Sequence, residues 1–188
     1  MNQGIGWLVS RIHITNNGVE WIMKACCVTG HRDIPADKIR FVERELRKEL
    51  QLALDDGYRH FISGFVDGAD LLFARLVIEY REKCGDIFLE AALPYPYWKK
   101  GNRECNALLS RCNGTRTCNR EYRPDCFQIR NQYMVDACER VIAVYDGREA
   151  GGTVNTIRYA RKLNREIRTI RIEKGSLNIG GLLLWRSL

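Results

Sequence analysis

The chain has 188 residues, a formal net charge of +7, 45% hydrophobic residues and 28% charged residues. This length suffices for one domain with a full core, and the composition is typical of a soluble globular protein. No apolar run reaches the roughly 20 residues of a membrane-spanning helix, so we predict no transmembrane segment. The positive charge favours anionic partners such as nucleotides or nucleic acid, but it fits a role in solubility equally well.

Eight cysteines would be compatible with a disulfide scaffold, but several fall in predicted core elements. Cys26 and Cys27 lie in the first core strand and Cys138 lies at the end of a helix, where thiols behave as small hydrophobic groups. The N-terminus lacks the long apolar segment and small-residue cleavage site of a secretory signal. We therefore expect reduced thiols and a cytoplasmic protein.

Residues 1–22 show no clear periodicity, and the first clear strand begins after Met23 and Lys24. Two interpretations remain open. Either the natural chain starts at Met23 and residues 1–22 are an extension, or residues 9–14 form an extra strand at the edge of the sheet. We expect the main domain to span residues 23–174. Residues 175–188 would be a C-terminal tail that packs on the body or on a second subunit.

The first repeating unit is a strand over residues 25–28, followed by the turn Thr29-Gly30-His31-Arg32 and a helix. Pro35 suits the first turn of that helix, and apolar residues then recur at three- and four-residue spacings as far as Gly57. The turn would lie at the carboxyl end of the strand. There His31 and Arg32 either contact a phosphate or ribose or belong to a solvated loop.

The second unit has a strand over residues 60–63, a glycine-bearing turn from Gly64 to Asp70, and a helix. Spacing alone favours a helix-capping or dipole-stabilising role for Asp67 and Asp70. A functional Asp70 would instead hydrogen-bond a ribose hydroxyl or orient the loop.

Residues 87–93 form a third predicted strand, which leads into the proline-fixed aromatic turn at residues 94–98. Its aromatic rings either stack on a base or form a hydrophobic lid. The pattern then weakens over residues 99–123, apart from one short helix. Four cysteines in this region contain no C-x-x-C pair, so we predict no metal site; they are Cys105, Cys112, Cys118 and Cys126.

A helix over residues 126–138 carries Arg130 and Asn131, which serve either a pocket or the solvent face. A strand at residues 141–144, the turn Gly151-Gly152-Thr153 and a further helix follow, and residues 167–172 form the last strand. A strand, a glycine turn and a helix in this order form an anion site, because the helix N-terminus offers unpaired N–H groups. Thr153 either caps that helix or turns its hydroxyl to a ligand. The alternative to an anion site is an ordinary strand-to-helix connection capped by Thr153.

Alternating strands and helices predict a single α/β domain. We expect a Rossmann-like, doubly wound and mainly parallel sheet of five or six strands with helices on both faces. Ligands bind such sheets at the carboxyl ends of the strands, where the strand order reverses. The turns after Val28, Ser63 and Val144 lie at that edge, so we expect them to meet in one crevice.

Five motifs occur in order within residues 23–172: TGHRDIP, SGFVDGADLLFA, ALPYP, CFQIRNQYMVD and VIAVYDGREAGGTVNTIRYARK. As a set they resemble the YpsA-like branch of the SLOG (Smf/DprA–LOG) superfamily. The resemblance implies a nucleotide or nucleotide-derived ligand (ADP-ribose-like), no required cofactor and commonly a homo-oligomer. By motif, the implied ligand-binding residues are Thr29, Gly30, His31, Arg32, Ser63, Gly64, Gly68, Asp70, Arg130, Asn131, Gly151, Gly152 and Thr153.

One departure from the superfamily concerns catalysis. LOG phosphoribohydrolases resemble P-G-G-x-G-T-x-x-E in the last loop, whereas here Val154 replaces a glycine and no glutamate follows at the expected place. Hydrolysis would then need Asp70 or Asp146 near the ribose, and we include Asp146 among the candidate ligand-binding residues.

Three functions remain open, each with its own candidate residues. One is a nucleotide sensor or sequestering protein. Another is an N-glycosidic hydrolase using His31, Asp70 and Arg130. The third is a DprA-like protein that binds single-stranded DNA through the basic residues 158–171, although such a charge run is usually a solvated face. A small-molecule nucleotide is the expected partner, with nucleic acid second and no membrane.

Overall fold

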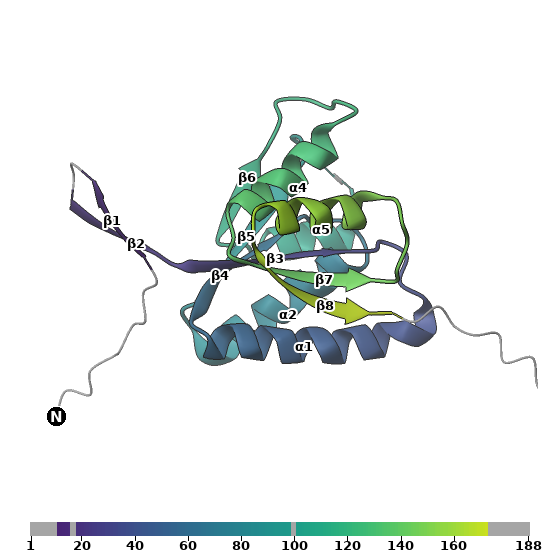
Figure 1. The fold of residues 1–188 in the computed structure, drawn as a ribbon, viewed down its shortest axis with the longest axis horizontal. Helices are drawn as coiled ribbons and strands as arrows, with labels where there is room; N and C mark the ends of the chain where they lie inside the picture. The colour runs from purple at the N-terminus through teal and green to yellow at the C-terminus, as the bar shows by residue number, and fades with distance from the viewer. Residues whose placement is uncertain (1–10, 16–17, 99–100, 173–188) are drawn as a thin grey trace, which may run out of the picture.

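The computed structural model describes residues 11–15, 18–98 and 101–172 (Figure 1). Its main body is a six-stranded parallel sheet in the order β6-β5-β4-β3-β7-β8. The strands are β3 (Lys24–Gly30), β4 (Tyr58–Ser63), β5 (Phe88–Leu93), β6 (Gly114–Thr117), β7 (Arg140–Tyr145) and β8 (Glu166–Arg171). The helices are η1 (Ala36–Lys38), α1 (Ile39–Asp55), α2 (Ala69–Cys84), α3 (Arg103–Leu109), α4 (Cys126–Asp136) and α5 (Gly152–Lys162).

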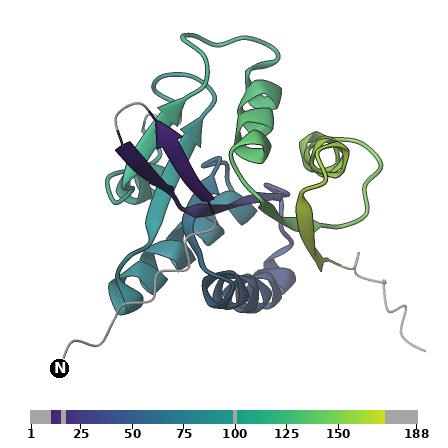
Figure 2. The ribbon, with the colours of Figure 1, turned by 60° about the vertical axis from the view of Figure 1, so that its left-hand side comes forward.

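Helices cover both faces of the sheet, which confirms the predicted Rossmann-like α/β fold (Figures 1 and 2). In β3, Cys26 and Val28 pack toward α1 and α2, while Ala25 and Cys27 pack toward α4 and α5. This alternation follows from the two-residue period of a strand. A strand buried on both faces has to be apolar throughout, and residues 25–28 meet that requirement.

The N-terminal part of the described chain is a hairpin of β1 (Arg11–Thr15) and β2 (Gly18–Ile22). These two strands pair antiparallel with each other in a sheet of their own (Figure 1). Residues 11–15 are therefore a strand, and residues 9 and 10 of the expected strand lie outside the described residues. The alternative in which this strand extends the edge of the main sheet is wrong. The predicted tail at residues 175–188 lies outside the described residues.

Strand β6 was not predicted. Its sequence, Gly-Thr-Arg-Thr, contains no large apolar residue, and its side chains are largely exposed at the sheet edge. It pairs in parallel with β5 from Gly114 opposite Glu90 to Thr117 opposite Leu93. Because this strand lies at an edge and buries little surface, hydrophobic periodicity carries no signal for it.

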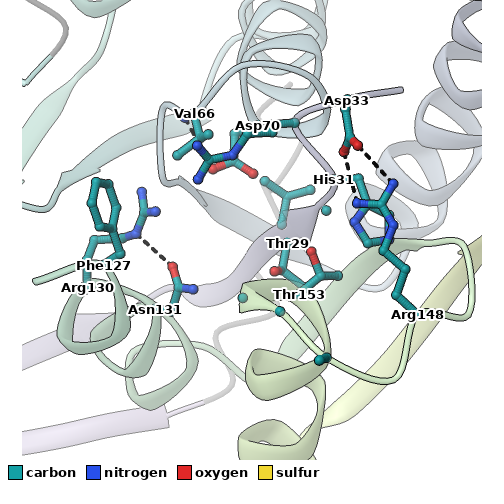
Figure 3. A pocket seen from close by; sticks show the side chains of 16 residues that line it. Thr29, His31, Asp33, Val66, Asp70, Phe127, Arg130, Asn131, Arg148 and Thr153 are labelled. Carbon is teal, nitrogen blue, oxygen red and sulfur yellow. Dashed lines mark hydrogen bonds and ion pairs between the residues drawn. The ribbon is translucent and has the colours of Figure 1, made fainter. Parts of the chain in front are cut away.

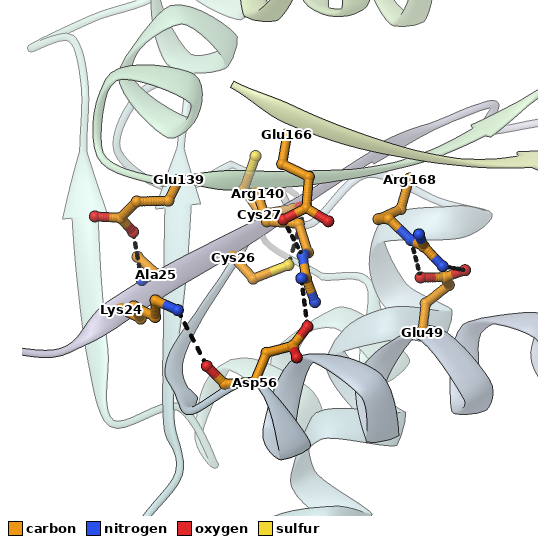
Figure 4. A network of polar contacts seen from close by, with 10 residues as sticks. All are labelled: Lys24, Ala25, Cys26, Cys27, Glu49, Asp56, Glu139, Arg140, Glu166 and Arg168. Atoms are coloured by element: carbon orange, nitrogen blue, oxygen red, sulfur yellow. Dashed lines mark hydrogen bonds and ion pairs between the residues drawn. The ribbon is translucent and has the colours of Figure 1, made fainter. Parts of the chain in front are cut away.

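A network of ion pairs fastens α1 to β7 and β8 (Figure 4). The buried Arg140 donates from Nη2 to Asp56 Oδ2 at 2.5 Å and from Nε to Glu166 Oε2 at 2.9 Å. Its guanidinium carbon lies 4.5 Å from the centre of the Tyr58 ring. Burial alone would lower the pKa of Arg140, but the hydrogen bonds to Glu166 and Asp56 outweigh burial and raise it. This network lies at the amino end of β7 and leaves the carboxyl ends of the strands to the cavity described next.

No helix in the described part of the chain is both long and apolar enough to cross a membrane.

Candidate functional site

A cavity of about 350 Å³ lies at the carboxyl ends of the central strands (Figure 3). The chain leaves β3 toward β4 on one side, and β7 pairs with β3 on the other, so the strand order reverses here. Ten of the fourteen predicted site residues line the cavity: Thr29, Gly30, His31, Arg32, Asp70, Arg130, Asn131, Gly151, Gly152 and Thr153. Four predicted residues are not part of its lining: Ser63, Gly64, Gly68 and Asp146.

Two glycines allow the first and second turns to interlock. A Cβ on Gly30 would lie 2.4 Å from Ala69 Cβ, so α2 approaches the end of β3 too closely for any side chain there. Gly68 has a φ of +78°, and its Cβ would lie 2.4 Å from the carbonyl oxygen of His31. Ala69 N donates a hydrogen bond to that same carbonyl at 3.2 Å. Gly68, rather than Asp67, occupies the N-cap of α2. It packs against the backbone of His31 and Arg32, two residues that line the cavity.

Arg130 is a buried cation in the cavity wall, with only 3% of the residue exposed. Its Nη1 donates to the carbonyl oxygens of Gly64 and Ala92, and its Nε donates to Asn131 Oδ1 at 2.8 Å. A Cβ on Gly64 would lie 2.1 Å from Arg130 Nη1. Gly64 therefore makes room for the guanidinium. Burial lowers the pKa of Arg130, but an arginine stays charged at neutral pH.

Asp70 is the buried anion beside this cation. Its Oδ2 accepts a hydrogen bond from Val66 N at 3.4 Å, and Ser63 Oγ donates to its backbone carbonyl at 2.9 Å. Burial raises the pKa of Asp70 to about 6, with Arg130 acting in the opposite direction. Asp70 thus lines the cavity and is ionised at neutral pH, while Ser63 supports it from outside the lining.

A chain of ionisable side chains connects the loops after β3 and β7. His31 Nε2 lies 2.8 Å from Asp146 Oδ1, and Arg148 Nε donates to Asp146 Oδ2 at 2.7 Å. Arg148 also donates from both terminal nitrogens to Asp33, at 2.9 and 3.2 Å. Figure 3 shows the Arg148–Asp33 pair on one side of the cavity. Asp146 therefore contacts His31 and Arg148, which line the cavity, but it is not itself part of the lining.

The protonation states of His31 and Asp146 follow from their surroundings. Burial lowers the pKa of His31, so its imidazole is neutral at pH 7. Burial would raise the pKa of Asp146, but the hydrogen bond from the backbone amide of Arg148 and the positive charge of the Arg148 side chain outweigh burial and lower it. The backbone N–H of Asp146 also donates a hydrogen bond to His31 Nε2 at 3.2 Å. Both the carboxylate and the backbone of Asp146 therefore hold the His31 ring in place beside the cavity.

The N-terminus of α5 forms the remaining wall. Gly151 is the N-cap residue with a φ of +119°, and a Cβ added to it would meet no atom within 4 Å. A Cβ on Gly152 would come no closer than 3.8 Å to Asn131 Nδ2. Thr153 is a buried residue of the first turn and does not occupy the N-cap. The first turn of α5 thus presents backbone N–H groups to the cavity without side chains in front of them.

Sequence analysis missed several residues of the lining, including Asp33, Phe127 and Arg148. Phe127 precedes Arg130 by three positions, so helical spacing places both on one side of α4 and could have identified it. Arg148 follows Asp146 in a predicted turn, but its partner Asp33 lies 115 residues away and no local pattern joins them.

Among the described residues, no group of three or more histidine, cysteine, aspartate or glutamate side chains is arranged to hold a metal ion. Cys105 and Cys126, two of the four cysteines of the irregular region, are buried.

An open parallel sheet with a polar cavity at the reversal of strand order defines a Rossmann-like α/β protein. The chain belongs to the YspA SLOG family, whose model matches residues 26–174.

UPF0398 proteins are among its relatives. Those of Bacillus thuringiensis strain Al Hakam and Bacillus cereus strain AH187 are 26% identical over 156 residues. Each alignment covers 74% of this chain and 84% of the relative.

Two solved structures share the fold. One is DNA processing protein A from Helicobacter pylori, described by its single-stranded DNA binding mode. It has a TM-score of 0.58 at 14% identity, over 82% of this chain and 67% of that one. The other is TM1055, with a TM-score of 0.50 at 20% identity, over 77% and 72% of the two chains.

Proposed function

We propose that the cavity binds a nucleotide-derived ligand of the ADP-ribose type, and that the protein acts as a sensor or sequestering protein for it. The observation that carries this proposal is the arrangement of charge in one cavity. An open helix N-terminus, three arginines and one buried carboxylate face the same space. The volume of about 350 Å³ is at the lower end of the roughly 300–1,000 Å³ of ligand pockets and suits a phosphate–ribose unit.

The phosphate belongs at the first turn of α5. The glycines at positions 151 and 152 leave the backbone open, and the positive end of the helix dipole favours an anion. Arg32, Arg130 and Arg148 line the same cavity and add positive charge. Arginine forms paired hydrogen bonds with phosphate oxygens, so this combination is suited to phosphate more than to a simple carboxylate.

The ribose belongs on the side of Asp70. With a pKa of about 6, this carboxylate is ionised at neutral pH and accepts hydrogen bonds from sugar hydroxyls. Asp146, the other proposed substitute for a catalytic carboxylate, is engaged by His31 and Arg148 and is not part of the lining. Of the two carboxylates that N-glycosidic hydrolysis could use, only Asp70 lies in the cavity lining, so the hydrolase alternative depends on Asp70.

Single-stranded DNA is the less favoured ligand. The basic residues 158–171 do not form one uninterrupted cationic face, since Arg168 pairs with Glu49 and Arg165 donates to the Asp136 carbonyl oxygen. The similarity to DNA processing protein A shows a shared fold at 14% identity, so the DNA-binding mode in its title remains a property of that protein.

Ligand-induced stabilisation tests the proposal. AMP, ADP-ribose, NAD, ribose 5-phosphate and a twelve-residue oligothymidylate would be compared by thermal shift. A bound ligand at a hundred times its dissociation constant adds about 2.7 kcal/mol to the unfolding free energy. Assaying the same mixtures for released base tests the hydrolase alternative.

Two arginine variants make the test specific to the cavity. Arg32→Gln should reduce stabilisation by AMP and ADP-ribose, because Arg32 lines the cavity. Arg40→Gln removes the same charge from an exposed position in α1 and should leave it unchanged. The proposal fails if no phosphorylated nucleotide stabilises the protein, or if the two variants behave alike. A steep loss of oligothymidylate binding with salt would instead support DNA binding.

A further inference from the structure

A second hollow of about 460 Å³ adjoins the cavity and lies between α4 and α5. We call it the α4–α5 groove. Phe127, Asn131 and Gly152 line both spaces, so the groove continues directly from the phosphate side of the cavity. The motifs that identified the cavity give no reason for a groove at this place.

The side chains of the α4–α5 groove suit a second nucleotide-like unit. Arg158 and Lys162 supply two cations, and no carboxylate belongs to the lining that the structure describes. Tyr159 adds a half-buried aromatic ring, while Gln128 and Gln132 add amides from α4. Residues 155, 158, 159 and 162 follow the three- and four-residue spacing that places side chains on one side of a helix. Amides and an aromatic ring recognise a base, and the cations recognise a phosphate.

The contacts that Tyr159 and Arg158 already make within the protein leave both side chains able to bind a ligand in the groove. The Tyr159 hydroxyl donates to Asp136 Oδ1 at 2.9 Å, and the half-buried ring packs partly on the core and partly lines the groove. Arg158 Nη2 donates to the Glu149 carbonyl oxygen at 3.1 Å, which leaves its other N–H groups for a ligand.

At the border between the cavity and the groove, the buried Arg130 side chain fixes the orientation of the Asn131 amide. Arg130 Nε is a donor, so the oxygen of the Asn131 amide must face it, as the 2.8 Å contact shows. The amide nitrogen of Asn131 then points toward Gly152, where the nearest approach to an added Cβ would be 3.8 Å. A donor and the open first turn of α5 therefore face each other at the border, where a bridging phosphate would be bound.

We propose that the ligand has two ribosyl units joined by a pyrophosphate and that the α4–α5 groove binds the second unit. The first unit occupies the cavity, the pyrophosphate crosses the border at Gly152 and Asn131, and the second unit lies on Tyr159 between Arg158 and Lys162. This inference rests on the proposed function and specifies its ligand class. A mononucleotide would fill only one of the two adjoining spaces.

Isothermal titration calorimetry with AMP and ADP-ribose tests the proposal. The wild-type protein should bind ADP-ribose about tenfold or more tightly than AMP, because a charge-assisted hydrogen bond contributes about 1.5–3 kcal/mol. Lys162→Gln and Arg158→Gln should each weaken ADP-ribose binding about tenfold and change AMP binding less than about twofold. Arg161→Gln is the matched control, since Arg161 is exposed on α5 outside the groove lining, and it should change neither affinity.

The outcomes separate the two proposals. If AMP binds and depends on Arg32, but ADP-ribose binds no tighter, the second subsite is wrong and the cavity assignment stands. If Lys162→Gln and Arg161→Gln have equal effects, the groove proposal is also overturned. If neither AMP nor ADP-ribose binds, the proposed function itself fails. Oligothymidylate binding that exceeds ADP-ribose binding and is weakened by Arg161→Gln would assign the groove to a polynucleotide and contradict the proposal.

Discussion

Gly64 illustrates how one backbone position controls a charged side chain. An alanine there would place Cβ 2.1 Å from Arg130 Nη1 and 2.7 Å from Asp70 Oδ2, distances that require atoms to move. Arg130 is buried and cannot swing into solvent, so Gly64→Ala should destabilise the protein by about 2 kcal/mol and weaken nucleotide binding. Urea denaturation measures the loss.

Gly152→Ala is the matched control for this experiment, because its Cβ would have ordinary spacing of 3.8 Å to the nearest atom. It should change the unfolding free energy by less than about 0.5 kcal/mol. Equal denaturation midpoints for the two variants would show that Arg130 is not confined as described.

Asp70 should make stability depend on pH. Its pKa is raised by burial from 3.8 to about 6, so between these pH values the folded protein binds the proton more strongly than the unfolded chain does. The contribution of Asp70 to unfolding free energy therefore falls as pH rises through this window, by about 3 kcal/mol in total.

The variant Asp70→Asn lacks this titration. Its unfolding free energy minus that of the wild type should increase from about pH 4 to about pH 6 and then level off. The comparison uses only the change with pH, so any constant effect of the amide cancels. Parallel stability curves for the two proteins across this range would contradict the assigned pKa.

At the scale of elements, Arg140 holds α1 against β7 and β8. Arg140→Met would lose the hydrogen bonds to Asp56 and Glu166 and the contact with the Tyr58 ring. Both carboxylates are about half exposed and stay hydrated, so the expected cost is about 2 kcal/mol rather than that of a fully buried pair. Arg111→Gln removes an exposed pair with Glu82 and should cost less than about 1 kcal/mol by the same denaturation measurement. Equal losses in the two variants would exclude a special role for the network.

The Arg148–Asp33 pair joins two loops beside the cavity, with Asp33 60% and Arg148 42% exposed. Asp33→Asn should therefore change stability by less than about 1 kcal/mol. It also removes a negative charge from the lining, so AMP affinity should rise about two- to fivefold at low salt. Calorimetry with Asp37→Asn as an exposed control checks this. Weaker AMP binding by Asp33→Asn would mean that Arg148 acts only when Asp33 holds it.

Regular units of the fold were predictable because each strand–turn–helix unit is encoded locally. The glycine-bearing turns after the strands at residues 25–28, 60–63 and 141–144 were sufficient to place the cavity at one edge of the sheet. The roles of Gly64 and Gly68 were not predictable, since their neighbours Arg130 and His31 come from other parts of the chain. The α4–α5 groove depends on how two helices approach each other, which neither helical pattern specifies.

At the scale of the whole molecule, the β1–β2 hairpin pairs only within itself among the described strands. A chain that begins at Met23 should therefore retain the six-stranded sheet and the cavity. Its unfolding free energy should lie within about 0.5 kcal/mol of that of the full chain. Denaturation and AMP binding by both chains test this. A marked loss in the shortened chain would assign residues 1–22 to the folded domain, against the predicted boundary.

The interlocked turns at Gly30 and Gly68 have one more consequence. They make the floor of the cavity from closely packed backbone, whereas side chains such as Asp33 and Arg148 occupy exposed loops beside it. Under the proposed function, substitutions in those loops should change which ligand is bound without disturbing the packing underneath. Chains with this fold could then differ in their ligand while they keep the same backbone around the cavity.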